Sequence, residues 1–230
     1  MNAIIAASLI EGGSVLQHLV GTLKHLEDDA FGASGIALVE DRGVRITRTM
    51  NALQALNHAN ALATAGLGVT ELFTRSAIQP LNCFDRLVIA VHGEIKNKDS
   101  LLELVAGKGY DVDGLMELPG AIIACMLDFY MSTETLNFNL IEALSLVMED
   151  ILGSVTIAVI DRQDKQTIAF AQKDSALYVV ENDQGVYISN QAEGVPTSDN
   201  VTVHQDHGIV ILREGQFIVY DYVEDCDLNS

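Results

Sequence analysis

The last third of the chain consists of short strand-like segments at close intervals, and this pattern constrains the fold more than any other feature. From residue 154 onward, runs of β-branched, aromatic and aliphatic residues alternate with turn sequences such as 161–164 and 181–184. The predicted strands are 154–160, 167–171, 176–180, 185–189, 201–204, 208–212 and 216–220.

The first two thirds of the chain mix strands with helices. Residues 3–9 are continuously apolar, which predicts a strand covered on both faces. Ser14 and Gln17 form a capping-box signature before leucines at helical spacing, so we expect a helix over 14–27. Further strands are predicted at 35–39, 44–49, 67–73 and 86–92, and helices at 99–106, 120–130 and 136–152. This order favours an α+β fold in which helices cover packed sheets.

Length and continuity indicate one domain. The 230 residues suffice for one large domain, and no linker, repeat or low-complexity stretch divides them. We therefore expect a domain over 1–223, followed by an acidic C-terminal tail over 224–230.

Charge and cysteine usage narrow the partners and the compartment. The formal net charge of −19 repels phosphate backbones and anionic membranes, which argues against nucleic-acid and membrane partners. Cys83, Cys125 and Cys226 lie far apart without CxxC spacing, as in proteins of a reducing compartment. The apolar N-terminal run has no basic residues before it and ends after about ten residues, unlike a signal peptide or a membrane span. The sequence predicts a cytoplasmic protein.

Short motifs spread along the chain resemble those of the glutaminase domain of class II glutamine amidotransferases, as found in glucosamine-6-phosphate synthase. Residues 1–6 (MNAIIA) resemble MCGIVG, 66–76 (GLGVTELFTRS) resemble GIGHTRWATHG, and 91–97 (VHGEIKN) resemble VHNGIIEN with one residue deleted. Residues 189–191 (SNQ) resemble SDQ, and 212–216 (LREGQ) resemble LEEGD. Each match alone is weak, and the shared order over about 220 residues gives the set its weight.

The resemblance implies the N-terminal-nucleophile hydrolase fold, a four-layer αββα sandwich of two stacked antiparallel sheets. In this family a free N-terminal cysteine attacks the side-chain amide of glutamine, and its own α-amine is the base. Here Asn2 stands at the nucleophile position, and an amide is not a nucleophile. Met1 is expected to stay in place, since its removal requires a small second residue. The resemblance therefore predicts a degenerate catalytic position.

The substrate-binding positions implied by the resemblance are also altered. Glu71 replaces the arginine that holds the substrate carboxylate. Leu118 falls near the aspartate that holds the substrate amine, and a small shift of the alignment puts Glu117 there instead. Gly93 matches an oxyanion-hole glycine, but the asparagine beside it is missing under either placement of the gap. Thr74 matches a substrate-binding threonine, although a hydroxyl at a strand end often serves only the backbone.

Three interpretations remain open at this point. The first is a non-catalytic pseudo-glutaminase with a binding or regulatory role toward a protein partner or a second copy. The second is an amidohydrolase or amidotransferase of the same fold with altered chemistry, using Cys83. The third is a domain in which Glu71 selects a small cationic ligand. His92 fits a core histidine, His204 and His207 lack a third ligand, and the sequence predicts neither metal nor cofactor.

Overall fold

The computed structural model describes residues 3–10, 13–26, 32–50, 63–72, 78–115, 118–132, 138–164 and 166–220. Strand β1 (Ala3–Leu9) is buried along its whole length. It pairs antiparallel with β4 (Ala65–Leu72) on one side and with β9 (Gly185–Ser189) on the other. The continuous apolar run is thus explained by a central strand with both faces covered.

The remaining elements follow the predicted order. The other strands are β2 (Gly32–Glu40), β3 (Gly43–Met50), β5 (Leu81–Cys83), β6 (Leu87–Gly93), β7 (Val155–Asp161), β8 (Thr167–Asn182), β10 (Val201–Arg213) and β11 (Gln216–Tyr220). The helices are α1 (Val15–Leu26), α2 (Lys98–Gly107), α3 (Pro119–Ser132) and α4 (Leu140–Asp150), with short 3-10 turns at Arg162–Asp164 and Ala192–Gly194. β5 was not among the predicted strands.

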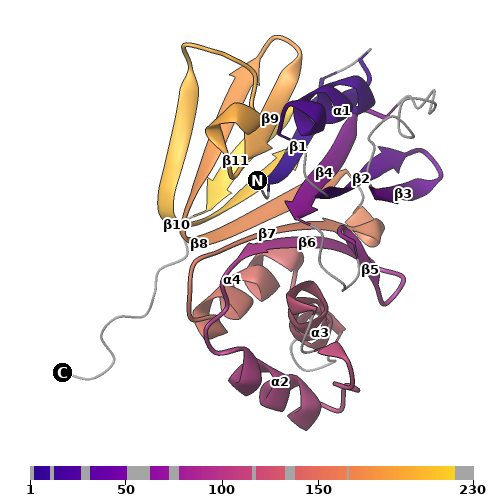
Figure 1. The fold of residues 1–230 in the computed structure, drawn as a ribbon, viewed down its shortest axis with the longest axis vertical. Helices are drawn as coiled ribbons and strands as arrows, with labels where there is room; N and C mark the ends of the chain where they lie inside the picture. The colour runs from indigo at the N-terminus through magenta and orange to yellow at the C-terminus, as the bar shows by residue number, and fades with distance from the viewer. Residues whose placement is uncertain are drawn as a thin grey trace.

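All the strand pairs are antiparallel, and they form two stacked layers (Figure 1). The first layer runs in the order β3-β2-β4-β1-β9 and continues into the C-terminal half of β8. The second runs β5-β6-β7, then the N-terminal half of β8, then β10 and β11. Because β8 and β10 pass through both layers, the hydrogen bonds link all the strands into one curled sheet.

The long strands β8 and β10 correct the sequence prediction. Each was predicted as two strands, since polar residues near Asp174 and Asp206 read as turns. Instead the two strands pair along their full length, and a bulge at Asp206/His207 absorbs the irregularity. Asp174 and Asp206 have φ values of 48° and 72°. These residues therefore mark the bend at which each strand leaves one layer and enters the other.

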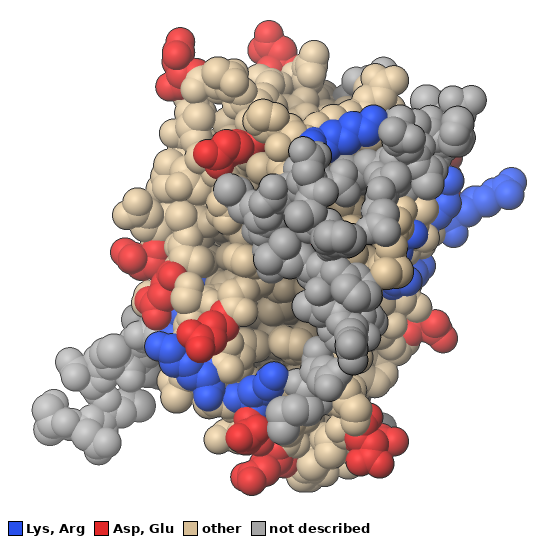
Figure 2. Space-filling view, viewed as in Figure 1, with Lys and Arg blue, Asp and Glu red and all other residues tan. Residues whose placement is uncertain are grey.

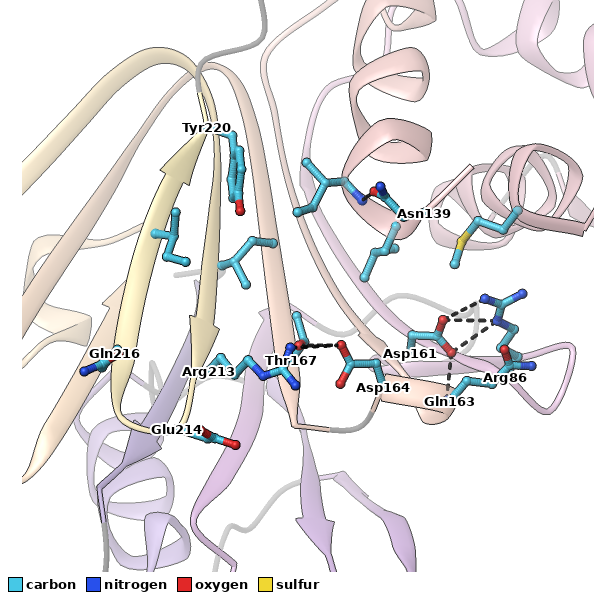
Figure 3. A pocket seen from close by; sticks show the side chains of 15 residues that line it. Arg86, Asn139, Asp161, Gln163, Asp164, Thr167, Arg213, Glu214, Gln216 and Tyr220 are labelled. Atoms are coloured by element: carbon cyan, nitrogen blue, oxygen red, sulfur yellow. Dashed lines mark hydrogen bonds and ion pairs between the residues drawn. The ribbon is translucent and has the colours of Figure 1, made fainter. Parts of the chain in front are cut away.

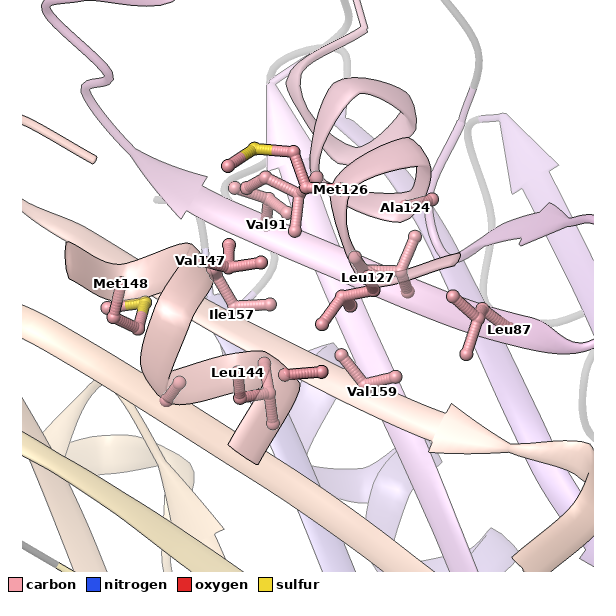
Figure 4. Packing of buried hydrophobic residues seen from close by; sticks show 14 of the residues in the cluster. Leu87, Val91, Ala124, Met126, Leu127, Leu144, Val147, Met148, Ile157 and Val159 are labelled. Atoms are coloured by element: carbon pink, nitrogen blue, oxygen red, sulfur yellow. The ribbon is translucent and has the colours of Figure 1, made fainter. Parts of the chain in front are cut away.

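Three apolar clusters fill the spaces between the layers. The inter-sheet core lies between the two layers and contains residues of both, such as Ile4 and Leu67 from the first and Ala158 and Phe170 from the second. A second cluster packs α1 on the outer face of β1 and β2. A third packs α2, α3 and α4 on the outer face of β6 and β7 (Figure 4). The arrangement is helix, sheet, sheet, helices, which confirms the predicted αββα sandwich.

Local signals explain where the helices begin. α3 begins at Pro119, as expected from a residue with a preset φ and no N–H to satisfy. α4 begins after Asn139, whose Oδ1 accepts from the backbone N–H of Ile141 and Glu142, while the Glu142 carboxylate accepts from Asn139 N. In the described part of the chain, no helix is both long and apolar enough to cross a membrane.

Candidate functional site

One end of the inter-sheet core is polar. Side chains alternate between the two faces of a strand, so Glu71 points to the same side as Val69, which belongs to the inter-sheet core. The same alternation places His92 on the side of Ala90. Thr156 pairs with His92, and Gln172 pairs with Thr156, in neighbouring strands. We call Glu71, Gln79, His92, Thr156 and Gln172 the polar end.

Gln79 bridges the two layers at this end. Its backbone N–H donates to one oxygen of the Glu71 carboxylate at 3.0 Å, and its Nε2 donates to the other oxygen at 3.1 Å. The same side-chain amide pairs with β6, since Nε2 also donates to Val91 O at 2.9 Å and Oε1 accepts from Val91 N at 2.6 Å. Glu71 in the first layer is thereby connected through Gln79 to the second layer. We call this set of contacts the Gln79 bridge.

The segment that carries Gln79 is held from two further directions. The Arg48 guanidinium on β3 donates to Pro80 O at 2.9 Å from Nε and at 2.6 Å from Nη2. Gly35 on β2 leaves no room for a side chain, because a Cβ there would collide with Gln79 O. The glycine is thus required by this close approach. The Gln79 bridge is a built part of the protein scaffold.

The start of β1 lies next to Glu71. Ala3 pairs with Thr70, the residue before Glu71. Asn190, which is 8% exposed, fixes the same end of β1: its Oδ1 accepts from Ile4 N at 2.8 Å, and its backbone N–H donates to Ile4 O at 3.2 Å. Among the described residues, Asn190 Nδ2 has no hydrogen-bond acceptor. The start of β1 is therefore held beside Glu71 of the polar end.

The predicted site residues divide into three groups. Asn2 and Thr74 lie outside the described residues, and their roles stay predictions. Glu71 and Gly93 lie in the same region. Gln79, which contacts Glu71, also contacts Val91, and Gly93 lies two residues after Val91 on β6. Leu118 directly precedes α3 and lines a groove of about 520 Å³ with Arg48 and Ile78, beside the segment that carries Gln79.

Gly93 also has a structural reason to be glycine. Its φ is 112°, and a Cβ at this position would collide with Ser154 O. The next residue, Glu94, donates its backbone N–H to the same Ser154 oxygen at 2.8 Å. The close approach of β6 and β7 therefore accounts for this glycine without any oxyanion hole.

Burial shifts the pKa values of a thiol and an imidazole near the site, those of Cys83 and His92. Burial raises the pKa of the Cys83 thiol to about 11, although nearby Arg48 opposes the shift. The nucleophilic thiolate is thus a minor form at neutral pH. Burial also lowers the pKa of His92, which favours the neutral imidazole. Among the described residues, no group of three or more His, Cys, Asp or Glu could hold a metal ion.

Sequence reasoning missed Gln79, the central residue of the site. The motif comparison pointed to Glu71 but gave no sign of what its carboxylate contacts. Gln79 lies eight residues later, in a loop with no helix or strand periodicity. An inward-facing carboxylate requires a hydrogen-bond donor. The polar side chains near Glu71 in the sequence were therefore the candidates for its partner.

Comparisons with known proteins bear on the family and the fold. No protein-family model matches the chain. It is 23% identical over 211 residues to the glutamine–fructose-6-phosphate aminotransferase of Clostridium tetani, which covers 87% of this chain and 32% of that protein. The chain thus spans about a third of the length of the curated relatives that it matches.

Solved structures give the same fold. A glutamine phosphoribosylpyrophosphate amidotransferase from B. subtilis superimposes with a TM-score of 0.69 at 11% identity, over 97% of this chain and 50% of that one. A glutamine aminotransferase class-II domain protein from Silicibacter pomeroyi gives a TM-score of 0.60 at 11% identity, over 96% and 99%. The chain is therefore a class II glutamine amidotransferase-like domain with the N-terminal-nucleophile hydrolase fold.

Proposed function

We propose that this domain is a pseudo-glutaminase, which has lost glutamine hydrolysis and has a binding or regulatory role. The observation that carries the proposal is the Gln79 bridge. Glu71, at the position of the substrate-carboxylate arginine, has both carboxylate oxygens engaged by Gln79. A carboxylate there repels the substrate carboxylate, and its hydrogen bonds hold the segment in place.

The sequence supports the same conclusion at the reacting atom. Asn2 supplies no thiol, and a retained Met1 leaves no free α-amine on residue 2. The nucleophile, the base and one oxyanion donor are thus all altered. The partner that we propose is a protein, either a catalytic amidotransferase or a second copy of this chain. The domain boundary at residue 223 and the cytoplasmic location stay predictions.

A second candidate, an amidohydrolase that uses Cys83, rests on the groove that this thiol shares with Leu118. The raised pKa of Cys83 weighs against it, since attack requires the thiolate. A site for a cationic ligand at Glu71 has less support, because each oxygen of the carboxylate already accepts a hydrogen bond from Gln79.

A glutaminase assay tests the proposal. Purified protein with glutamine should release ammonia no faster than buffer, and intact mass should show Met1 retained. Turnover that is abolished by Cys83→Ser, but kept by Cys125→Ser as the matched control, would establish the second candidate instead. Turnover in a protein that has lost Met1 would refute the pseudo-glutaminase.

A further inference from the structure

Two free cysteines lie on elements that pack together, the edge strand β5 and the helix α3. Cys83 ends β5, and Cys125 lies near the middle of α3. Cys83 points to the same side of β5 as Leu81, because side chains alternate along a strand. On that side, Cys125 belongs to the apolar cluster under the helices, and Cys83 packs against this cluster. The proposed pseudo-glutaminase uses neither thiol.

One face of α3 follows the end of β5. Ala121, Cys125 and Asp128 are four and three residues apart, so their side chains form one row along the helix. At the start of this row, Ala121 lines the groove of about 520 Å³ together with Cys83. At its end, the Asp128 carboxylate accepts a hydrogen bond from Tyr110 Oη at 2.7 Å.

Tyr110 connects the end of this row back to β5. Its ring packs edge-on against Phe84, the residue after Cys83, with ring centroids 5.7 Å apart. The row on α3 therefore runs alongside residues 83 and 84, and its middle member, Cys125, lies beside Cys83. Burial raises the pKa of the Cys125 thiol to about 11, and the nearby Cys83 adds to the shift. The two thiols are thus close enough to interact.

The turn after Cys83 holds the backbone of this residue in place. Phe84 and Asp85 have φ values of 55° and 50°, and Arg86 N donates to Cys83 O at 3.1 Å. The Arg86 guanidinium then contacts the carboxylate of Asp161 on β7, at 3.1 Å from Nε and at 2.8 Å from Nη2 (Figure 3). The turn that positions Cys83 against α3 is therefore itself anchored to the sheet.

We propose that Cys83 and Cys125 form a reversible disulfide, with a low-molecular-weight disulfide such as oxidised glutathione as the oxidant. The Cys83 thiolate attacks one sulfur of the oxidant, which forms a mixed disulfide and releases the first small thiol. The Cys125 thiolate then attacks the Cys83 sulfur, which closes the bond between the two cysteines and releases the second small thiol. The two cysteine protons and two electrons pass to the oxidant, which leaves as two thiols.

The surroundings of the two thiols set this order of attack. Cys83 is half-buried and lines the groove, whereas Cys125 is 5% exposed. Acidic side chains are spread around the face seen in Figure 2, and basic ones gather on the side that carries β3. Arg48 of β3 lines the same groove as Cys83 and favours its thiolate. An anionic oxidant therefore meets a cation at Cys83, within a chain of formal net charge −19.

The bond changes the groove beside the Gln79 bridge. It joins β5 to α3 covalently and removes the Cys83 thiol from the groove. Because β5 begins at Leu81, two residues after Gln79, the bond also restrains the segment that carries the bridge. Disulfides that form in a reducing compartment are usually transient and redox-sensing. The pair therefore makes the groove sensitive to the redox state.

Oxidation of a Cys226→Ser variant tests the proposal, because only Cys83 and Cys125 then remain. The folded protein is treated with oxidised glutathione at about pH 9, where more of each thiol is ionised. Intact mass should fall by two hydrogens, both thiols should disappear from a thiol titration, and dithiothreitol should restore them. The melting temperature should rise by roughly 5–10 °C, because the bond closes a long loop in the unfolded chain.

Two variants of this background separate the native pair from chance contact. With Cys125→Ser, a glutathione adduct should remain on Cys83, since no second thiol displaces it. With Cys125→Ser and Ala124→Cys together, the thiol moves to the neighbouring residue of α3, and the adduct should again remain. Equal melting temperatures of the reduced proteins show that each variant is folded.

Two results would overturn the proposed disulfide. The first is a protein with both cysteines that keeps its two thiols, or stops at the adduct, over the time in which the Cys125→Ser variant forms its own adduct. The second is an internal disulfide that forms equally fast with the thiol at residue 124, because the native placement of Cys125 would then have no effect.

Discussion

The inter-sheet core has an apolar centre and a polar end, and the two follow different rules. At the centre, Phe170, Ile160 and Leu67 are fully buried and belong to the apolar inter-sheet cluster. At the polar end, Gln172 and Thr156 are equally buried but carry hydrogen-bonding groups. The centre contributes hydrophobic free energy in proportion to the area it buries, whereas each polar group must have a partner to avoid a cost.

The apolar centre and the polar end differ in how much sequence change they tolerate. The apolar centre depends on shape and volume, which many sequences satisfy, so the αββα sandwich persists at about a quarter identity or less. The polar end has no such tolerance, because an inward-facing carboxylate needs a donor. Here Gln79 provides that donor to Glu71.

The largest expected effect is at the apolar centre. Phe170→Ala should lower the free energy of unfolding by about 3–5 kcal/mol, because it removes a fully buried ring and leaves a cavity. Urea unfolding followed by circular dichroism measures the loss. Phe84→Ala is the control, since Phe84 is 48% exposed and should cost far less. Equal losses would mean that the centre does not dominate stability.

The Gln79 bridge comes next. Gln79→Ala should cost about 1–3 kcal/mol, because it leaves Val91 N–H without its acceptor and removes the side-chain donor to one oxygen of the Glu71 carboxylate. Gln216→Ala, at an exposed glutamine, is the matched control and should be close to neutral. In a double-mutant cycle, Glu71→Ala and Gln79→Ala should be non-additive. If Gln79→Ala unfolds like the wild type, the bridge is not structural.

A smaller expected effect is the pH dependence of stability, which we assign to His18 on α1. Burial lowers the pKa of His18, which packs edge-on against Tyr187, from 6.5 to about 4. The unfolded chain binds this proton more readily, so stability is complete above about pH 6.5 and falls as pH drops toward 4. His18→Gln should remove about 1–2 kcal/mol of the loss between about pH 7 and about pH 5.

Urea midpoints at the two pH values measure this effect. His25→Gln, at an exposed position of the same helix, is the control and should keep the wild-type slope. A wild-type slope in the His18→Gln protein would assign the pH dependence elsewhere, with the half-buried His92 as the next residue to test.

The smallest expected effect is catalytic. Asn2→Cys restores a thiol and allows Met1 removal, yet it should release no measurable ammonia from glutamine. The missing oxyanion donor costs about 3–4 kcal/mol. The lost charged contact to the substrate carboxylate costs roughly 1.5–3 kcal/mol more. Asn2→Ala, which also frees residue 2 but adds no thiol, is the control in the same ammonia assay.

A repair series shows how much of the site has changed. Asn2→Cys combined with Glu71→Arg and an asparagine inserted after His92 should be the smallest set that gives activity. Turnover by Asn2→Cys alone, near that of working relatives, would mean that the polar end still accepts glutamine. The proposed loss of glutamine binding at the polar end would then be wrong.

The sequence by itself determined the order and type of most elements and the fold class, because these depend on local periodicity. Each of these patterns can be recognised within a short stretch of sequence. Examples are the apolar run 3–9, the leucine spacing before Leu26 and the closely spaced C-terminal strands. It also determined that Asn2 is not a nucleophile, which is a matter of chemistry alone. The motif order predicted the N-terminal-nucleophile hydrolase fold that the structure and comparisons confirm.

Only the tertiary structure decided what distant residues do to one another. Asp174 and Asp206 read locally as turns, yet pairing between two long strands accommodates them in a bend. Glu71 read as a residue facing a substrate, yet a donor eight positions away in a loop holds it. The physical reason is the same in both cases: a polar group is satisfied by whichever partner the fold brings near, and that partner leaves no periodic trace in the sequence.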